Sequence, residues 1–209
     1  MAAKNVTKWA KMPSPETVDN TAAAIEERGF NVIRVDTKDE AFEKLKEILP
    51  DGAEVMTGSS TTLYQIGFMD YYISGDNPWV RLGPEIFTEK DPQVQATLRR
   101  KAVTAEYMLG SVNAIAETGE LVACDMSGSR VSAYPFAAKN LILVAGVQKI
   151  TRNLQEAMQR VREYVLPLES ERAMNAYGIP SGLGKWVILE HEYNPNRITV
   201  MLVNEALGF

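Results

Sequence analysis

Residues 31–62 decide the fold, and they read NVIRVDTKDEAFEKLKEILPDGAEVMTGSSTT. Residues 31–36 form an apolar strand, and residues 38–49 repeat apolar side chains at the spacing of one buried helix face. Pro50 ends that helix, and residues 53–57 form a second strand that runs directly into a Gly-Ser-Ser-Thr-Thr turn. A strand, a helix and a strand in this order predict a βαβ unit with parallel strands.

The same alternation continues along the rest of the chain. Ser14 and Pro15 begin a helix that ends before Gly29, and residues 74–92 are expected to form a long irregular loop. The pattern therefore predicts an α/β fold with a mainly parallel sheet, helices on both faces and a C-terminal β-hairpin appendage. A single domain over residues 1–209 is expected, with its core at about 14–168 and the appendage at about 169–209. The other helices are predicted at residues 63–72, 91–109 and 154–166, and the other strands at 140–144, 186–190 and 198–203.

Composition narrows the class of protein. The net charge of -5 over 209 residues argues against a nucleic-acid binder, and the basic run at 99–101 fits a solvated helix face. One cysteine, Cys124, excludes an intramolecular disulfide and suits a reducing compartment. With a single histidine, His191, which we interpret as structural or solvated, no metal site and no intrinsic iron–sulfur cluster are expected. No apolar run reaches about 18 residues and no signal peptide is recognisable, so a cytoplasmic protein without membrane contact is expected.

The turn at residues 58–62 is the first candidate for ligand binding. It lies where a strand passes into a helix, and the free amides at a helix start attract an anion. Gly58 permits close backbone approach, and the hydroxyls of Ser59, Ser60, Thr61 and Thr62 add hydrogen-bond donors. No Gly-Lys-Ser/Thr follows, so this is not a P-loop. The alternative is a helix cap with spare hydroxyls.

The second candidate is Glu117, within an apolar hairpin that covers residues 113–122. A carboxylate beside a buried strand is paired with another group, solvated or part of a site. Glu117 is therefore either a site residue, acting as a base, a covalent nucleophile or a hydrogen-bond anchor, or a solvated turn residue. Thr118 and Gly119 complete the turn, and Asn113 either orients a substrate or satisfies the backbone.

Three further residues belong to turns. Arg130 ends a Ser-Gly-Ser-Arg turn, where it suits a carboxylate or phosphate or else lies on the surface. Gly146 and Lys149 close another strand end, where Lys149 either neutralises a ligand or lies in solvent. Ligands of α/β sheets bind at the carboxyl ends of strands, so we expect these candidates to share one anion pocket.

Together these pieces resemble the LUD-domain family, which is named for lactate utilisation. The resemblance covers most of the chain from about residue 15. It rests on residues 57–62 with 65–67, 113–122, 127–131, 143–146 with 149–150, 154–161 and 197–208.

The resemblance implies a Rossmann-like fold of the ribose phosphate isomerase and CoA-transferase superfamily. A strand-end glutamate beside a glycine is the nucleophile in CoA transferases, and Glu117 looks similar in kind. Similar lactate-utilisation proteins work with iron–sulfur partners. Many members of the similar branch carry cysteines between the last long helix and the last strand, but residues 176–186 hold none here.

Three functions follow from these observations. The first is a LUD-domain protein that binds an anionic small molecule, in the utilisation of lactate or a similar small organic acid, with an iron–sulfur oxidoreductase subunit as a candidate partner. The second is a stand-alone isomerase or CoA-transferase-like enzyme that uses Glu117. The third is a non-catalytic binding or assembly protein. The sequence leaves open whether the chain is an enzyme, which cofactor it uses and whether its tail strands form a homodimer.

Overall fold

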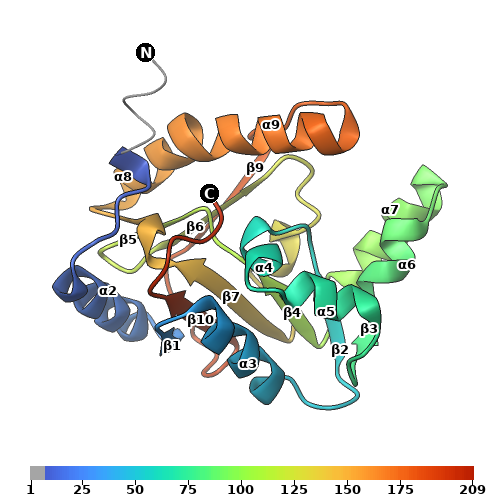
Figure 1. Ribbon diagram of the computed structural model, residues 1–209, viewed down its shortest axis with the longest axis horizontal. Coiled ribbons are helices and arrows are strands. Elements are labelled where there is room, and N and C mark those ends of the chain that lie inside the picture. Colours follow the sequence, from blue (N-terminus) through green and yellow to red (C-terminus); the bar gives the residue numbers. More distant parts are fainter. Residues whose placement is uncertain (1–7) are drawn as a thin grey trace.

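The computed structural model describes residues 8–209, which form two β-sheets with helices packed around them (Figure 1). The larger sheet has the strand order β1-β10-β7-β4-β2-β3, and all its neighbouring strands are parallel. The smaller sheet has the order β8-β5-β6-β9.

The helices are α2 (Pro15–Glu27), α3 (Lys38–Ile48), α4 (Thr61–Gln65), α5 (Phe68–Ser74), α6 (Gly83–Thr88), α7 (Pro92–Ala102), α8 (Leu154–Arg160) and α9 (Leu166–Tyr177), with short helical turns η1 (Val131–Ala133), η2 (Val147–Lys149) and η3 (Val161–Val165). The strands are β1 (Asn31–Val35), β2 (Glu54–Thr57), β3 (Val80–Arg81), β4 (Tyr107–Gly110), β5 (Ala114–Ala116), β6 (Leu121–Asp125), β7 (Asn140–Gly146), β8 (Ile150–Thr151), β9 (Lys185–Leu189) and β10 (Ile198–Val203).

The predicted α/β class, with a mainly parallel sheet and helices on both faces, is confirmed. Helices α3, α4 and α5 cover one face of the larger sheet, where Leu45, Leu63 and Phe68 are fully buried. Helices α2 and α7 share the other face with the smaller sheet, whose Ile115 packs in the same apolar cluster as Val200 of β10. The far side of the smaller sheet is covered by the long helix that runs from α8 to α9 (Figure 1).

The order of the strands was not predictable from the alternation alone. Strands β1 and β2 lie in one parallel sheet, but β10, β7 and β4 separate them. The C-terminal hairpin is wrong in detail, because β9 pairs antiparallel with β6 while β10 lies between β1 and β7. Strand β10 reads Ile-Thr-Val-Met-Leu-Val and is buried along nearly its whole length. Such a continuous apolar run is typical of an interior parallel strand rather than an edge hairpin.

Three element boundaries also differ from the prediction. The helix expected to reach residue 109 ends at Ala102, because residues 107–110 pair with β2 and β7 as strand β4. The loop expected at 74–92 contains β3 and α6. The helix expected to end at residue 166 continues to Tyr177 through the π-helical turn η3. Pro167 accounts for that turn, since it has no N–H to continue the regular hydrogen-bond ladder.

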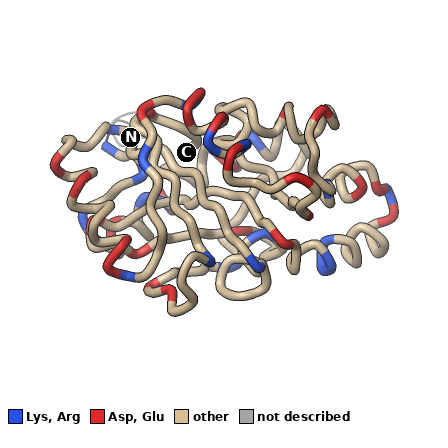
Figure 2. Tube along the Cα trace, turned by 90° about the horizontal axis from the view of Figure 1, so that it is seen from below, with Lys and Arg blue, Asp and Glu red and all other residues tan. Residues whose placement is uncertain are grey.

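Charged residues of both signs are interspersed along the outside of the molecule (Figure 2). In this view of residues 8–209 the lysines and arginines do not form one continuous stretch, consistent with the net charge of -5.

Within residues 8–209, no helix combines the length and the apolar character that crossing a bilayer requires.

Helix α2 is fastened to the turn between β5 and β6 by Arg28. Its Nε donates to the carbonyl of Thr118 at 2.6 Å, and its Nη2 pairs with Glu120 at 2.8 Å. Gly119 has a φ of +94°, and a Cβ at this position would lie 2.5 Å from the carbonyl oxygen of Ala24 in α2. The turn therefore requires glycine both for its backbone conformation and for its contact with α2.

The substitution Gly119→Ala is expected to lower the free energy of unfolding by about 3 kcal/mol, because it adds a steric clash to the left-handed backbone. Gly178→Ala is the matched control. Gly178 also has a positive φ, of +73°, but a Cβ at this position would have no other atom within 4 Å, so a loss of about 1 kcal/mol is expected. Urea denaturation measures both, and equal losses would contradict the contact with α2.

Candidate functional site

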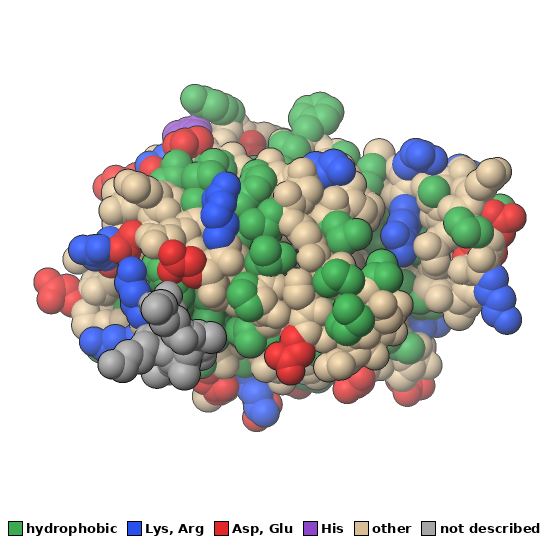
Figure 3. All heavy atoms as spheres, turned by 90° about the horizontal axis from the view of Figure 1, so that it is seen from above, with side chains coloured by type: hydrophobic (Ala, Val, Ile, Leu, Met, Phe, Trp, Pro, Cys, Tyr) green, Lys and Arg blue, Asp and Glu red, His purple; other side chains and the backbone are tan. Residues whose placement is uncertain are grey.

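A cavity of about 800 Å³ lies at the carboxyl ends of four parallel strands. Residues 58–62 follow β2, residues 111–113 follow β4, Lys149 follows β7, and residues 208–209 follow β10, and all of them line the cavity. Helices α6, α7 and α9 also line the cavity, as do the end of β6 with the turn that follows it and the segment after α9. Helices α6 and α7 form a lobe that projects from the main body (Figure 1), and the space-filling view shows the surface hollowed beside this lobe (Figure 3). This is the strand edge at which open α/β sheets bind ligands.

The turn at residues 58–62 acts both as a helix cap and as cavity wall. The hydroxyl of Ser60 accepts from the amide of Leu63 and caps α4. A Cβ on Gly58 would lie 2.9 Å from Cδ of Arg130, so the absence of a side chain lets Arg130 pack against the turn. The structure thus brings two of the predicted binding segments into direct contact.

Three consecutive carbonyls beside the cavity each accept a hydrogen bond from a different cation. The carbonyl of Ser111 accepts from Nη1 of Arg130 at 3.1 Å, and that of Val112 accepts from Nζ of Lys149 at 3.1 Å. The carbonyl of Asn113 accepts from Nη1 of Arg160 at 2.5 Å. Residues 111–113 link β4 of the larger sheet to β5 of the smaller one. The three cations therefore gather at the junction of the two sheets.

Lys149 is only 3% exposed, and its other two hydrogen bonds go to hydroxyls. Nζ lies 3.0 Å from Oγ1 of Thr62 and 2.9 Å from Oγ of Ser111. No carboxylate within the described chain forms an ion pair with this amine. Burial, followed by the charges of Arg160 and Arg130, lowers the pKa of Lys149 well below its ordinary value.

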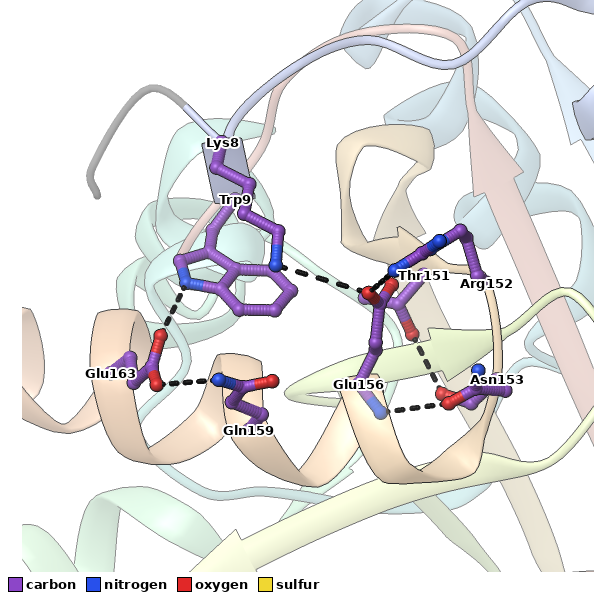
Figure 4. Close-up of polar contacts among 8 residues, drawn as sticks. All are labelled: Lys8, Trp9, Thr151, Arg152, Asn153, Glu156, Gln159 and Glu163. Atoms are coloured by element: carbon purple, nitrogen blue, oxygen red, sulfur yellow. Dashed lines mark hydrogen bonds and ion pairs between the residues drawn. The ribbon is translucent and has the colours of Figure 1, made fainter. Parts of the chain in front are cut away.

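Arg160 lies on the buried face of α8 and is fully inaccessible to solvent. Its Nε donates to the carbonyl of Trp9 at 3.1 Å, and its Nη2 has no partner among residues 8–209. Burial lowers the pKa of Arg160 to about 10, so the side chain stays charged at neutral pH. Trp9 is held over this helix by a hydrogen bond from its Nε1 to Glu163 (Figure 4).

Arg130 differs from the other two cations because a carboxylate lies near it. Asp125 accepts from the Arg130 backbone amide at 3.0 Å. Nη1 of Arg130 also donates to the hydroxyl of Tyr134 at 2.8 Å, and Nη2 donates to the carbonyl of Cys124 at 2.8 Å. Burial opposes the charge, but Tyr134 and Asp125 outweigh it and raise the pKa of Arg130.

Most of the predicted binding residues line this one cavity. Asn113 also satisfies the backbone, since its Oδ1 accepts from the amide of Cys124 at 2.7 Å. The predicted residues at the cavity are Gly58, Ser59, Ser60, Thr61, Thr62, Asn113, Arg130 and Lys149.

Four of the predicted residues are not brought to the cavity: Glu117, Thr118, Gly119 and Gly146. Glu117 is half-buried in the β5–β6 turn, where its amide donates to the carbonyl of Thr151 at 2.7 Å. Thr118 and Gly119 face α2 instead. Gly146 is fitted against the chain near its C-terminal end, because a Cβ there would lie 2.5 Å from the carbonyl oxygen of Glu205.

The sequence reasoning missed several residues of the site. Arg160 carried a usable signal, since it is a charge on the apolar face of a helix that also buries Ala157 and Val161. Gly208 carried none, and a Cβ there would lie 2.3 Å from Oγ1 of Thr62 and 3.1 Å from Nζ of Lys149. The structure also adds Cys124, Asp125 and Phe209 to the cavity wall.

The segment between the last long helix and the last strand, where the family resemblance implies cysteines, also borders the cavity. Residues 177 and 179–183 form part of its wall without a thiol. In the part of the chain that the structure describes, no three His, Cys, Asp or Glu side chains are grouped to hold a metal ion.

Comparison with known proteins assigns the family. The sequence matches the family model described as the LUD domain over residues 18–203. The chain belongs to the LUD-domain family. No curated protein gives a significant match to this LUD domain.

A solved structure similar to this LUD domain is that of a DUF162 family protein from Deinococcus radiodurans, determined at 1.70 Å resolution. The TM-score is 0.56, and the match covers 93% of this chain and 100% of the other. Since the two sequences are 14% identical, the likeness shows the shared fold.

The lowered pKa of Lys149 predicts a specific pH dependence of stability. In the unfolded chain this lysine holds its proton up to a pKa of about 10.4, whereas in the native protein it releases the proton at lower pH. Between the two pKa values the unfolded state binds one more proton, so the free energy of unfolding rises with pH.

We therefore expect the wild type to gain stability relative to Lys149→Met as the pH rises from 7 to 10, by up to about 1.4 kcal/mol per pH unit. Denaturant titrations of both proteins across this range measure the difference. Lys139→Met, which removes an exposed lysine, serves as control and should track the wild type more closely. A constant difference between Lys149→Met and the wild type would contradict the burial of an easily deprotonated amine.

Proposed function

We propose that this LUD domain binds the anion of a small organic acid of the lactate class in the cavity at the carboxyl ends of β2, β4, β7 and β10. The observation that carries the proposal is the group of three basic side chains around residues 111–113, of which Arg130 and Arg160 stay charged at neutral pH. Among residues 8–209, Arg130 is the one of the three with a carboxylate close by, in Asp125. An anion in the cavity would supply the missing negative charge, and a low local dielectric strengthens that attraction.

The polar groups are arranged for a carboxylate or phosphate. The hydroxyls and amides of residues 58–62 lie beside Arg130, whose planar guanidinium suits two-oxygen anions. The volume of about 800 Å³ lies in the range of sites for ligands larger than a three-carbon acid. The ligand panel should therefore extend from lactate and pyruvate to sugar phosphates and CoA esters.

Ligand-dependent thermal stability tests the proposal. A ligand at about 100 times its dissociation constant stabilises the native state by roughly 2.7 kcal/mol, or about 5–10 °C for a chain of this size. We expect at least one anion of the panel to give a shift of this order, and uncharged analogues to give none.

Arg130→Gln should raise the apparent dissociation constant of that ligand about tenfold or more, because it removes a charged hydrogen-bond donor from the cavity wall. The thermal shift at a given ligand concentration should therefore be smaller. Glu117→Gln is the matched control: Glu117 lies outside the cavity, so its variant should bind as the wild type does. Loss of binding in Glu117→Gln with retention in Arg130→Gln would refute the proposed site and favour the CoA-transferase-like alternative.

A further inference from the structure

The hydrogen-bond partners of the Lys149 side-chain amine suit an uncharged amine that can act as a nucleophile. Its three hydrogen-bond partners, Thr62, Ser111 and the carbonyl of Val112, are all uncharged. A neutral amine donates two hydrogen bonds and accepts one, and either hydroxyl can donate to its lone pair. Oγ of Ser111 lies 3.3 Å from both Oγ1 of Thr62 and the carbonyl of Val112, so the network remains complete without a charge on the lysine.

The neighbouring charges decide which of the three cations gives up its proton. Arginine stays protonated in proteins, and Arg130 and Arg160 are therefore fixed charges. A third positive charge beside them costs free energy in a site shielded from water. Of these three side chains, the lysine is the one that deprotonates readily. A lysine that is shielded from water and lies near another cation is a well-known kind of amine nucleophile. The lowered pKa of Lys149 agrees with this argument.

The amine is also placed where a ligand can reach it. Lys149 lines the cavity although it is only 3% exposed, and residues 58–62 line the same space. The chain at Gly208 passes close to Nζ and leaves room because this residue has no side chain. Arg130 lies on the same cavity wall, so an anionic group and a reactive carbon of one ligand have separate partners.

We propose that Lys149 is a catalytic residue that forms an imine with the carbonyl group of a 2-oxo acid. This inference rests on the proposed function, because it uses the same cavity and assigns the carboxylate of the ligand to Arg130. The nitrogen lone pair attacks the carbonyl carbon, and one proton passes from the nitrogen to the carbonyl oxygen to give a carbinolamine. The second proton passes from the nitrogen to the hydroxyl group, which leaves as water as the C=N bond forms, so amine and ketone become imine and water without oxidation or reduction. The hydroxyls of Thr62 and Ser111 lie within hydrogen-bond distance of Nζ and transfer these protons.

Reductive trapping tests the imine directly. The full chain is incubated at pH 7 with pyruvate and sodium cyanoborohydride, and the product is examined by intact-mass and peptide mass spectrometry. We expect one adduct per chain, located at Lys149. Exposed lysines, with a pKa of about 10.4, are almost fully protonated at this pH and should react far more slowly.

Variants separate a reactive lysine from a structural one. Lys149→Met should abolish the adduct, while Lys139→Met, which removes an exposed lysine, should retain it. Thr62→Val should slow trapping about tenfold or more, because it removes one proton-transferring hydroxyl. Circular dichroism spectra establish that each variant is folded. The rate of trapping in the wild type should rise with pH well below the range in which exposed lysines lose their proton, following deprotonation of the amine.

The outcomes distinguish this inference from the anion-binding proposal. If pyruvate raises the melting temperature but leaves no adduct at Lys149, the imine is refuted and the anion site stands. If pyruvate neither stabilises nor labels the protein while neutral acetone is trapped at Lys149, the nucleophile is supported and the anion site is refuted. Labelling that is spread over surface lysines and unchanged in Lys149→Met overturns the inference.

Discussion

The structure depends on the hydrogen bonds that three basic side chains make to three consecutive carbonyls at residues 111–113. This segment is the passage from the six-stranded sheet to the four-stranded sheet. Arg130, Lys149 and Arg160 reach it from a turn after β6, from the end of β7 and from helix α8. Buried charge is costly unless it is satisfied, and carbonyl oxygens satisfy the donors without cancelling the charge. The same contacts thus tie the two sheets together and leave the adjoining cavity positive.

Local sequence patterns predicted the elements better than their arrangement. The helix at residues 15–27, with Ser14 as its cap, follows from capping chemistry that acts within a few residues. Residues 107–109 fell within the helix predicted to begin at Asp91 and Pro92, but pairing with β2 and β7 makes residues 107–110 a strand. The place of β10 in the middle of the sheet depends on partners more than 50 residues away in the chain, which local periodicity does not encode.

In the candidate site, too, local sequence features were predicted better than the long-range arrangement. Gly58 and Lys149 were predicted from strand ends, and the carboxyl edge of a parallel sheet does gather such residues. Arg130 was predicted from a Ser-Gly-Ser-Arg turn, and this turn reaches the cavity after β6 of the smaller sheet. Glu117 also follows a strand, but β5 belongs to the smaller sheet, whose turn faces α2. One sequence cannot show which sheet a short strand joins. Arg160 was overlooked because a cation on an apolar helix stripe usually extends to solvent, whereas the segment at Trp9 covers this one.

The position of β10 has a consequence for how the chain acquires its structure. Within residues 8–209, strand β1 pairs with β10 alone, and β10 is made from residues 198–203. During synthesis β1 therefore waits, without a neighbour in the sheet, until residues 198–203 have left the ribosome. The main sheet is completed by insertion of its last strand between β1 and β7, a contact of long sequence separation and a slow kind of folding step. Until that insertion, the exposed strand edges of β1 and β7 are the part of the nascent protein most in need of protection from aggregation.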